Sequence, residues 1–296
     1  MSANADPNPA PSLASETWVT TRTCNHRFTR LLTLTKEVGG ADDNRGFIMK
    51  NIKDIVYRQL AIDYCLDKDE LAGTENCFHT FEALPGRRRF QQDTESFLRI
   101  AVIKNRLLFA GDPRIIDWCR QKYEKEDGAW FFEPQVLREL DHELARYGYG
   151  VDHMHPFYTS GEPSDPAPCP YEIRIYRGVE IEEFRGDKRF TNAFTFKPEA
   201  PDMIGIAALN EGKIIGMAGA SADSPLMWQI GIDVLPEARG RGVGVMLVER
   251  IRNEILKEGV LPYYGADFSH MVSQNIAIRS GFTLAFVELT AEKLAE

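Results

Sequence analysis

Several features are scarce or missing in this sequence, and each absence excludes a class of protein. No apolar run approaches the roughly 20 residues of a membrane-spanning helix. The first residues lack the basic and apolar regions of a secretory signal. Cysteine is rare, and no two cysteines form a C-x-x-C pair. An odd number of scattered cysteines is not a disulfide framework, so we expect reduced thiols in a cytoplasmic protein. The cysteines are Cys24, Cys65, Cys77, Cys119 and Cys169.

An excess of positive charge is also missing. The 296 residues include 35 lysines and arginines against 44 aspartates and glutamates, which gives a net charge of −9. This balance argues against a general nucleic-acid binder, and we expect neither nucleic acid nor a membrane among the partners. The isolated triplet Arg87–Arg89 is therefore expected to lie in a solvated loop. His153 and His155 have the spacing of one strand face, but no third ligand is close in sequence, so we predict no metal site.

The length and the composition divide the chain into four parts. Residues 1–48 are rich in proline, serine, alanine and asparagine, which predicts a disordered N-terminal extension. Residues 49–158 predict a smaller α+β domain, and residues 159–170 form a proline-rich linker. Residues 171–296 predict an α/β domain of ordinary size.

The sequence just before Met49 suggests an alternative translation start. Arg45 and Gly46 imply purine-rich codons of the kind found in a ribosome-binding sequence. We therefore hypothesise that the native protein begins at Met49 rather than at Met1.

Hydrophobic periodicity predicts the helices and strands of both domains. The predicted helices cover residues 50–66, 112–122, 134–147, 180–184, 242–257 and a segment around residue 273. The predicted strands cover residues 98–103, 106–110, 151–158, 171–176, 203–209, 214–219, 227–234, 261–266 and 282–289.

The stretch from Ile230 to Arg250 is the most informative part of the chain. It has the pattern of a buried strand, a proline turn, a glycine-rich loop and a helix. Glycines let the backbone approach a ligand closely, and the unpaired N–H groups at a helix N-terminus bind phosphate. Arg239 and Arg241 add charge and donors beside the loop. The glycines are Gly240, Gly242 and Gly244.

Three kinds of phosphate-binding loop compete for this stretch. A Walker loop ends in Gly-Lys-Ser/Thr, and a dinucleotide fingerprint needs G-x-G-x-x-G. Neither pattern is present, because the glycines here are spaced G-x-G-x-G. The string V-x-P-x-x-R-G-x-G-x-G, from Val234 to Gly244, resembles without a gap the acyl-CoA pyrophosphate loop of the GNAT superfamily of N-acetyltransferases. A glycine-rich turn without a ligand is the plainer alternative.

A second motif supports this resemblance. The stretch from His270 to Phe282 is similar to the family's next helix and its exit, although His270 stands where asparagine is usual. The resemblance covers about residues 171–296. It implies an α/β (α+β) fold, in which a mixed-sheet acyl-CoA N-acyltransferase (GNAT-like) domain follows the smaller α+β domain. Matching positions are Ser273, Ala277, Arg279, Gly281 and Phe282.

The resemblance also implies a reaction. An acyltransferase of this family moves an acetyl, or related acyl, group from acetyl-CoA to a primary amine by direct attack. It separates two neighbouring parallel strands, here those ending at Val234 and near Ala266, and the pantetheine arm pairs with the backbone of the first. The implied cofactor-binding residues are Ile232, Asp233, Val234, Arg239, Gly240, Arg241, Gly242, Val243, Gly244, Val245, His270 and Ser273.

The usual catalytic helpers of the family are missing. Ala277 stands where many members have a tyrosine, and Trp228 stands where some have a glutamate. Asp267, at the end of a predicted strand, is the first candidate for a base, although a helix-capping aspartate is an alternative role. The rival to an enzyme is therefore a non-catalytic CoA-binding regulatory module. The acceptor stays open between a small-molecule amine and a peptide amine, and a homodimer is possible.

Overall fold

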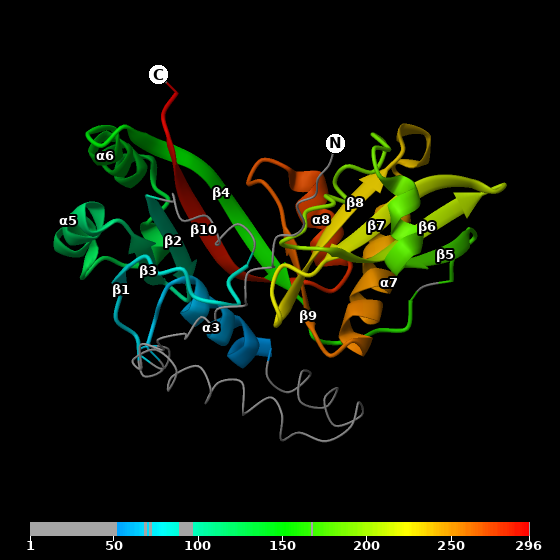
Figure 1. Ribbon diagram of the computed structural model, residues 1–296, viewed down its shortest axis with the longest axis horizontal. Coiled ribbons are helices and arrows are strands. Elements are labelled where there is room, and N and C mark those ends of the chain that lie inside the picture. The colour runs from blue at the N-terminus through cyan, green and yellow to red at the C-terminus, as the bar shows by residue number, and fades with distance from the viewer. Residues whose placement is uncertain (1–51, 68–69, 71–72, 89–96, 167, 296) are drawn as a thin grey trace, which may run out of the picture. The chain divides into compact units, whose positions relative to one another are not determined.

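The computed structural model describes residues 52–67, 70, 73–88, 97–166 and 168–295 (Figure 1). These residues belong to one compact unit, which spans Ala41–Glu296. The predicted disordered extension, residues 1–48, and the hypothesised start at Met49 lie outside the described residues.

The described residues form one mixed sheet of ten strands. Its spatial order is β1-β3-β2-β10-β4-β9-β8-β7-β6-β5. Two neighbouring pairs, β1 with β3 and β8 with β9, are parallel, and the others are antiparallel. The mixed α/β fold predicted from the sequence is therefore confirmed. The strands are β1 (Cys77–Thr80), β2 (Leu98–Ile103), β3 (Arg106–Gly111), β4 (Tyr149–Thr159), β5 (Glu172–Arg177), β6 (Asp202–Asn210), β7 (Lys213–Ser221), β8 (Met227–Val234), β9 (Leu261–Gly265) and β10 (Thr283–Lys293).

The helices begin and end within a few residues of the predicted positions. The α-helices are α3 (Ile52–Asp63), α5 (Pro113–Tyr123), α6 (Pro134–Ala145), α7 (Val243–Lys257) and α8 (Met271–Arg279). A 3-10 helix covers Gly178–Phe184, where a short helix was predicted. Helix α5 shows why local signals suffice here: the Asp112 side chain accepts the N–H of Arg114, and Pro113 occupies the first turn. The short strand β1 was not predicted, because four residues carry little periodicity.

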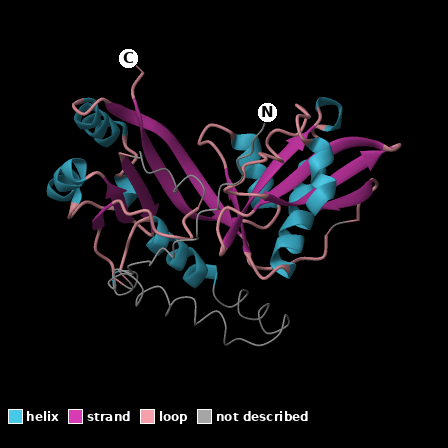
Figure 2. Cartoon of the chain, in the orientation of Figure 1, coloured by secondary structure: helices cyan, strands magenta, loops and turns pink. Residues whose placement is uncertain are grey.

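Strands β4 and β10 connect the two halves of the sheet (Figure 1 and Figure 2). They pair along most of their length, from Thr159 opposite Thr283 to Tyr149 opposite Lys293. The outer edge of β10 pairs with β2, and the outer edge of β4 pairs with β9. Strands from both sides of the 159–170 segment thus share one sheet. The four-part division of the chain stays a prediction.

Helices and irregular segments cover both faces of the sheet around β6, β7 and β8. Ile206 and Ile230 face one way, into the core that α7 closes with Leu247. The next residue along β6, Ala207, faces the opposite core, which the 3-10 helix closes with Phe184. This alternation is the period-two pattern of a strand buried on both faces.

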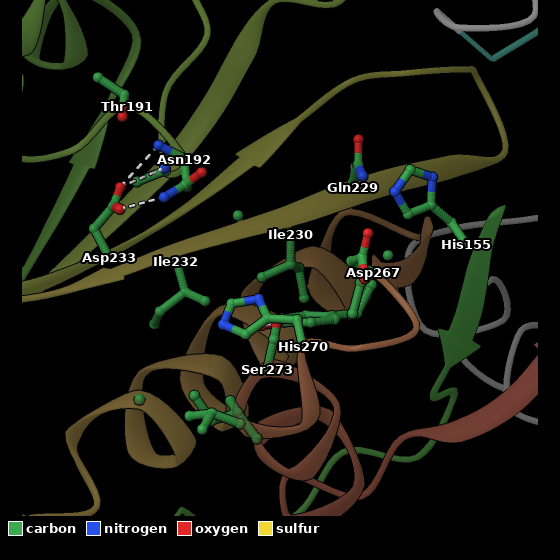
Figure 3. A pocket seen from close by; sticks show the side chains of 18 of the residues that line it. His155, Thr191, Asn192, Gln229, Ile230, Ile232, Asp233, Asp267, His270 and Ser273 are labelled. Carbon is green, nitrogen blue, oxygen red and sulfur yellow. Dashed lines mark hydrogen bonds between the residues drawn. The ribbon is translucent and has the colours of Figure 1, made fainter. Parts of the chain in front are cut away.

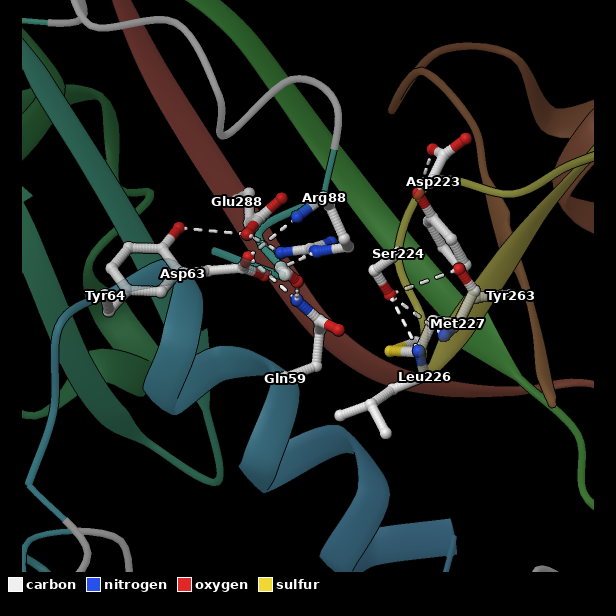
Figure 4. A network of polar contacts seen from close by, with 11 residues as sticks. Gln59, Asp63, Tyr64, Arg88, Asp223, Ser224, Leu226, Met227, Tyr263 and Glu288 are labelled. Atoms are coloured by element: carbon white, nitrogen blue, oxygen red, sulfur yellow. Dashed lines mark hydrogen bonds and ion pairs between the residues drawn. The ribbon is translucent and has the colours of Figure 1, made fainter. Parts of the chain in front are cut away.

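A buried ion pair fixes α3 to β10 (Figure 4). Arg88 donates from Nε to Asp63 Oδ2 at 2.6 Å and from Nη2 to Glu288 Oε1. Tyr64 donates its hydroxyl to the same Glu288 oxygen at 3.0 Å. Burial raises the pKa of Glu288, and the Arg88 charge opposes that rise.

The expectation of a solvated arginine loop is wrong for the two arginines that the structure describes. Arg87 and Arg88 are 2% and 0% exposed, and Arg89 lies outside the described residues. A buried guanidinium is tolerated because its charge is paired with buried carboxylates.

Two glycines bring a loop into backbone contact with the sheet. Gly219 on β7 and Gly231 on β8 are direct cross-strand partners. A Cβ on Gly219 would lie 1.8 Å from the Ala193 carbonyl oxygen, and one on Gly231 would lie 1.8 Å from that of Asn192. Asp233 holds the loop there, since its Oδ2 accepts the N–H groups of Asn192 and Ala193 at 2.9 Å each. This loop forms one wall of the cleft described below.

The first prediction concerns this contact. Gly231→Ala should lower the free energy of unfolding by about 1–3 kcal/mol, because the added methyl group overlaps a fixed backbone carbonyl. Urea denaturation measures the change. Gly216→Ala on β7 is the matched control, and it should cost less, since its Cβ would first meet a side-chain atom, Val243 Cγ1 at 3.0 Å, and the nearest backbone atom is 3.3 Å away. Equal stability of the Gly231→Ala protein and the wild type would contradict the close contact.

Candidate functional site

The two parallel strands β8 and β9 pair over only three residue pairs. Their ladder runs from Met227 opposite Leu261 to Gln229 opposite Tyr263 and stops there. Beyond that point β8 continues to pair with β7, as far as Val234 opposite Gly216. Within the described part of the chain, no strand pairs with the other edge of residues 230–234. The separation of these two strands that was predicted from the sequence is thus present.

A cleft of about 1780 Å³ opens where the strands separate (Figure 3). Strand β8, the glycine-rich loop, the segment after β9 and helix α8 line this cleft, together with the loop around Asn192 and parts of β4 and β10. The cleft therefore extends from the helix N-terminus of α7 to β4, which comes before the 159–170 segment.

The glycine-rich loop has the conformation that only glycine adopts easily. Gly240 and Gly242 have φ angles of +75° and +79°. A Cβ on either would meet nothing within 4 Å, so the backbone angle, and not crowding, requires glycine. Gly242 is the N-cap of α7, and no side chain caps this helix. The first N–H groups of α7 thus remain available to an anionic ligand.

Two other predicted cofactor-binding positions in the loop are buried in the fold. Gly244 is required for packing, since its Cβ would lie 2.9 Å from Ile276 Cδ1 of α8. The Val243 side chain is 1% exposed and belongs to the core. Both residues line the cleft, as does Val245. Val243 and Gly244 can contact a ligand only through their backbone atoms.

The two arginines beside the loop differ in position. Arg239 lines the cleft, and its Nε donates to the Val234 carbonyl oxygen at 3.1 Å. Arg241 is exposed and is not among the cleft-lining residues. Both arginines are within four residues of Val243, the first residue of α7, and their charge has the same sign as the helix dipole at that end.

The predicted residues of β8 also line the cleft. Ile232 and Val234 pack against the α7 core, whereas the Asp233 carboxylate is occupied by the Asn192 loop. Their side chains are thus committed to the fold, and the strand can offer a ligand its backbone.

His270 and Ser273 lie on the opposite side of the cleft, at the start of α8 (Figure 3). His270 is exposed and is the N-cap residue of α8. The Ser273 hydroxyl lies 2.8 Å from the Tyr264 hydroxyl. Burial raises the pKa of Tyr264, so this phenol is protonated at neutral pH.

Asp267 is exposed at the cleft and occupied by its own turn. Its Oδ1 accepts the Ser269 N–H at 2.8 Å and the Ser269 hydroxyl at 2.6 Å. These hydrogen bonds lower the pKa of Asp267, and a carboxylate with a lowered pKa is a weaker base. Its role as the catalytic base stays a prediction.

Sequence reasoning missed His155 as a cleft residue, because it considered this histidine only as a metal ligand. His155 is half-buried on β4 and lines the cleft near Gln229 and Asp267 (Figure 3). Burial, followed by the neighbouring His153, lowers its pKa. The strand spacing of the two histidines was visible in the sequence, but the pairing of β4 with β9 was not.

Among the described residues, one side-chain group has the spacing of a metal site. Glu70, Cys77 and His79 converge, and His79 Nε2 lies 3.0 Å from Glu70 Oε1. However, Arg106 Nη2 donates to Cys77 Sγ at 2.9 Å. A guanidinium beside the sulfur disfavours a bound cation, so we interpret the group as an ion pair. The absence of a metal stays a prediction.

The comparisons with known proteins agree with the sequence motifs. Residues 170–280 match the model of the Acetyltransferase (GNAT) family. No curated protein matches the sequence. Among the described helices, none combines the length and the apolar composition needed to cross a membrane.

Three solved structures are similar at low identity. A GCN5-related N-acetyltransferase-like protein from Streptococcus suis 89/1591 is 15% identical with a TM-score of 0.43, over 81% of this chain and 98% of that one. A GCN5-related N-acetyltransferase from Sphaerobacter thermophilus is 14% identical with a TM-score of 0.41, over 67% and 77%. One from Kribbella flavida is 16% identical with a TM-score of 0.39, over 52% and 63%. The assignment of a family therefore depends on the match of residues 170–280.

The second prediction tests the turn that holds Asp267. Ser269→Ala removes the hydroxyl that contributes most to lowering the pKa of Asp267, so this pKa should rise toward the ordinary value of about 3.9. Carbon-detected NMR titration of the carboxylate measures it. Ser273→Ala, whose hydroxyl contacts Tyr264 instead, should leave the Asp267 titration unchanged. A pKa that does not move in the Ser269 variant would contradict the hydrogen bond.

Proposed function

Because residues 170–280 form an acetyltransferase (GNAT) family domain, we propose that this protein transfers the acetyl group of acetyl-CoA to a primary amine by direct attack. The observation that supports the proposal most is the separation of β8 from β9 beside an uncapped helix N-terminus. The helix N-terminus would bind the diphosphate of coenzyme A, and the open strand edge beside it would bind the extended pantetheine arm.

The coenzyme A diphosphate is proposed to bind the N–H groups of the glycine-rich loop and the first turn of α7, from Gly240 to Val245. An anion is favoured there by the unpaired donors, the helix dipole and the exposed guanidinium groups of Arg239 and Arg241. The open space where a Cβ of Gly240 or Gly242 would stand leaves room for phosphate oxygens. His270 and Ser273, across the cleft, would contact the arm.

The pantetheine arm is proposed to lie along the unpaired edge of Ile230–Val234, as an added strand lies on a sheet edge. The thioester would then reach the end of the cleft near Gln229. Backbone N–H groups of this edge would stabilise the negative charge that develops on the thioester oxygen. This contribution requires no particular side chain, which fits a strand whose side chains are committed to the fold.

A non-catalytic CoA-binding module is the second candidate. The buried Ala277 and Trp228 stand where the family often has a proton donor and a base, and Asp267 is held by its turn. Only turnover distinguishes the enzyme from the binding module, whether the acceptor is a small-molecule amine or a peptide amine. The cytoplasmic location and a homodimer stay predictions.

The third prediction tests the diphosphate site. Gly242→Asp should abolish acetyl-CoA binding, because the added carboxylate both occupies the open space and repels phosphate. Isothermal titration calorimetry measures the affinity, and circular dichroism checks that the fold is retained. Gly259→Asp is the matched control: Gly259 has a φ of +78° and follows the opposite end of α7, so the backbone angle is matched while the diphosphate site is untouched. Unchanged affinity in the Gly242 variant would refute the site.

The fourth prediction separates the enzyme from the binding module. The protein should release thiol from acetyl-CoA faster with at least one amine than with buffer alone. The amines in the test panel are kanamycin, spermidine, lysine and a peptide with a free N-terminus. A thiol-reactive dye measures the rate, and mass spectrometry identifies the acetylated amine. Tight acetyl-CoA binding without thiol release from any amine would favour the binding module.

A further inference from the structure

We propose that His155 is the catalytic base that removes the proton from the acceptor amine; this inference rests on the proposed function. The residue comes from β4, outside the 170–280 region that matches the family. It lines the same cleft as the unpaired edge of β8 (Figure 3).

The strand register places His155 beside Asp267, at the end of the cleft near Gln229 where the thioester is proposed to lie (Figure 3). The ladder between β4 and β9 ends with Phe157 opposite Gly265. His155 precedes Phe157 by two residues, and Asp267 follows Gly265 by two residues. The continued register therefore places these two residues opposite each other, just beyond the end of the ladder. Burial and His153 lower the pKa of His155, and the Asp267 charge opposes that lowering, as expected for a carboxylate close to the ring. Strand β9 carries this ladder on one edge and separates from β8 on the other.

The groups that face His155 come from every neighbouring element. On its own strand are Asp152 and His153, whose ring centroid is 5.3 Å from that of His155. Opposite on β10 is Glu288, which is held by Arg88. From the segment after β9 comes Asp267. The ring of Phe157, 6.3 Å away, forms the apolar floor.

His155 is better suited to accept a proton than its charged neighbours. Its lowered pKa leaves the imidazole neutral at pH 7, so the basic form is the abundant one. Asp267 has a lowered pKa and an oxygen occupied by Ser269, which makes it suited to stabilise the imidazolium that forms. His153 is more exposed, with Nε2 at 3.0 Å from Asp152 Oδ2.

The step balances without any further reactant. The ammonium form of the acceptor gives one proton to the His155 imidazole, and the free amine forms a C–N bond with the thioester carbonyl carbon. The C–S bond breaks, and the electron pair leaves with sulfur. The second nitrogen proton is lost as the amide forms. One of the two protons ends on the thiol, and His155 returns the other to solvent.

The fifth prediction compares two histidine variants of the full chain. His155→Gln should lower kcat with the fastest panel amine by about 100-fold or more, without changing the affinity for acetyl-CoA. The loss should be smaller with hydroxylamine, which is largely uncharged at neutral pH and needs no deprotonation before attack. His153→Gln on the same strand face is the matched control and should retain the plateau rate.

The pH profile gives the test a second readout. The rate should rise as the pH passes upward through the pKa of His155, since only the neutral imidazole accepts a proton, and then level off. Asp267→Asn removes a charge that raises this pKa, so the rise should move to lower pH. His153→Gln removes a neighbour that lowers this pKa, so the rise should move to higher pH. Shifts in opposite directions would identify His155 as the titrating group.

The outcomes distinguish a failure of the His155 assignment from a failure of the proposed acetyltransferase function. If the wild type turns over and His155→Gln keeps its rate or its pH profile, the assignment of His155 is overturned while the acetyltransferase proposal stands. An equal loss with hydroxylamine and with the cationic amine also overturns it. If the wild type binds acetyl-CoA and releases thiol with no amine, the proposed function fails and this inference fails with it.

Discussion

The short parallel ladder between β8 and β9 is the constraint on which the rest of the site depends. It ends at Gln229 because β9 turns toward β4, with which it pairs through Phe157, Tyr158 and Thr159. Strand β4 is in turn held along its length by β10. The opening between β8 and β9 is thus maintained by hydrogen bonds to a strand that precedes the family-matching region. A sheet edge left unpaired in this way presents backbone donors and acceptors to whatever enters the cleft.

The local parts of the fold and of the site were predictable from the sequence, and the long-range parts were not. The glycine-rich loop and the helix after it follow from residues that are neighbours in the chain, so periodicity and glycine positions suffice. The burial of Arg88 depends on Asp63 and Glu288, which are 25 and 200 positions away. The position of His155 in the cleft depends on the pairing of two strands that lie far apart in sequence. No local pattern encodes such partners, and with a single sequence they become visible only in the folded chain.

Under the proposed function, the structure of β8 explains why side-chain motifs say little about the acceptor. Along β8, Ile230 and Ile232 face the α7 core, and Gly231 and Asp233 face the Asn192 loop. Both faces are committed to the fold, so the cleft edge of the strand is backbone. Recognition of a ligand by backbone tolerates many sequences, so in the proposed reaction the discrimination among acceptors would come from side chains on other elements. The histidines of β4 and the exposed start of α8 are the elements placed to do this.

The contact of the Asn192 loop with Gly219 and Gly231 has a consequence for that discrimination. Backbone rests directly on backbone there, and Asp233 holds it in place. The two glycines place no side chain between the layers, so the backbone of this wall cannot move closer to the sheet to make room for a larger molecule. In the proposed reaction, acceptors of different size would therefore be accommodated mainly by the opposite wall. Natural variants that differ in substrate size should accumulate their changes on β4 and α8, while the pair of glycines persists.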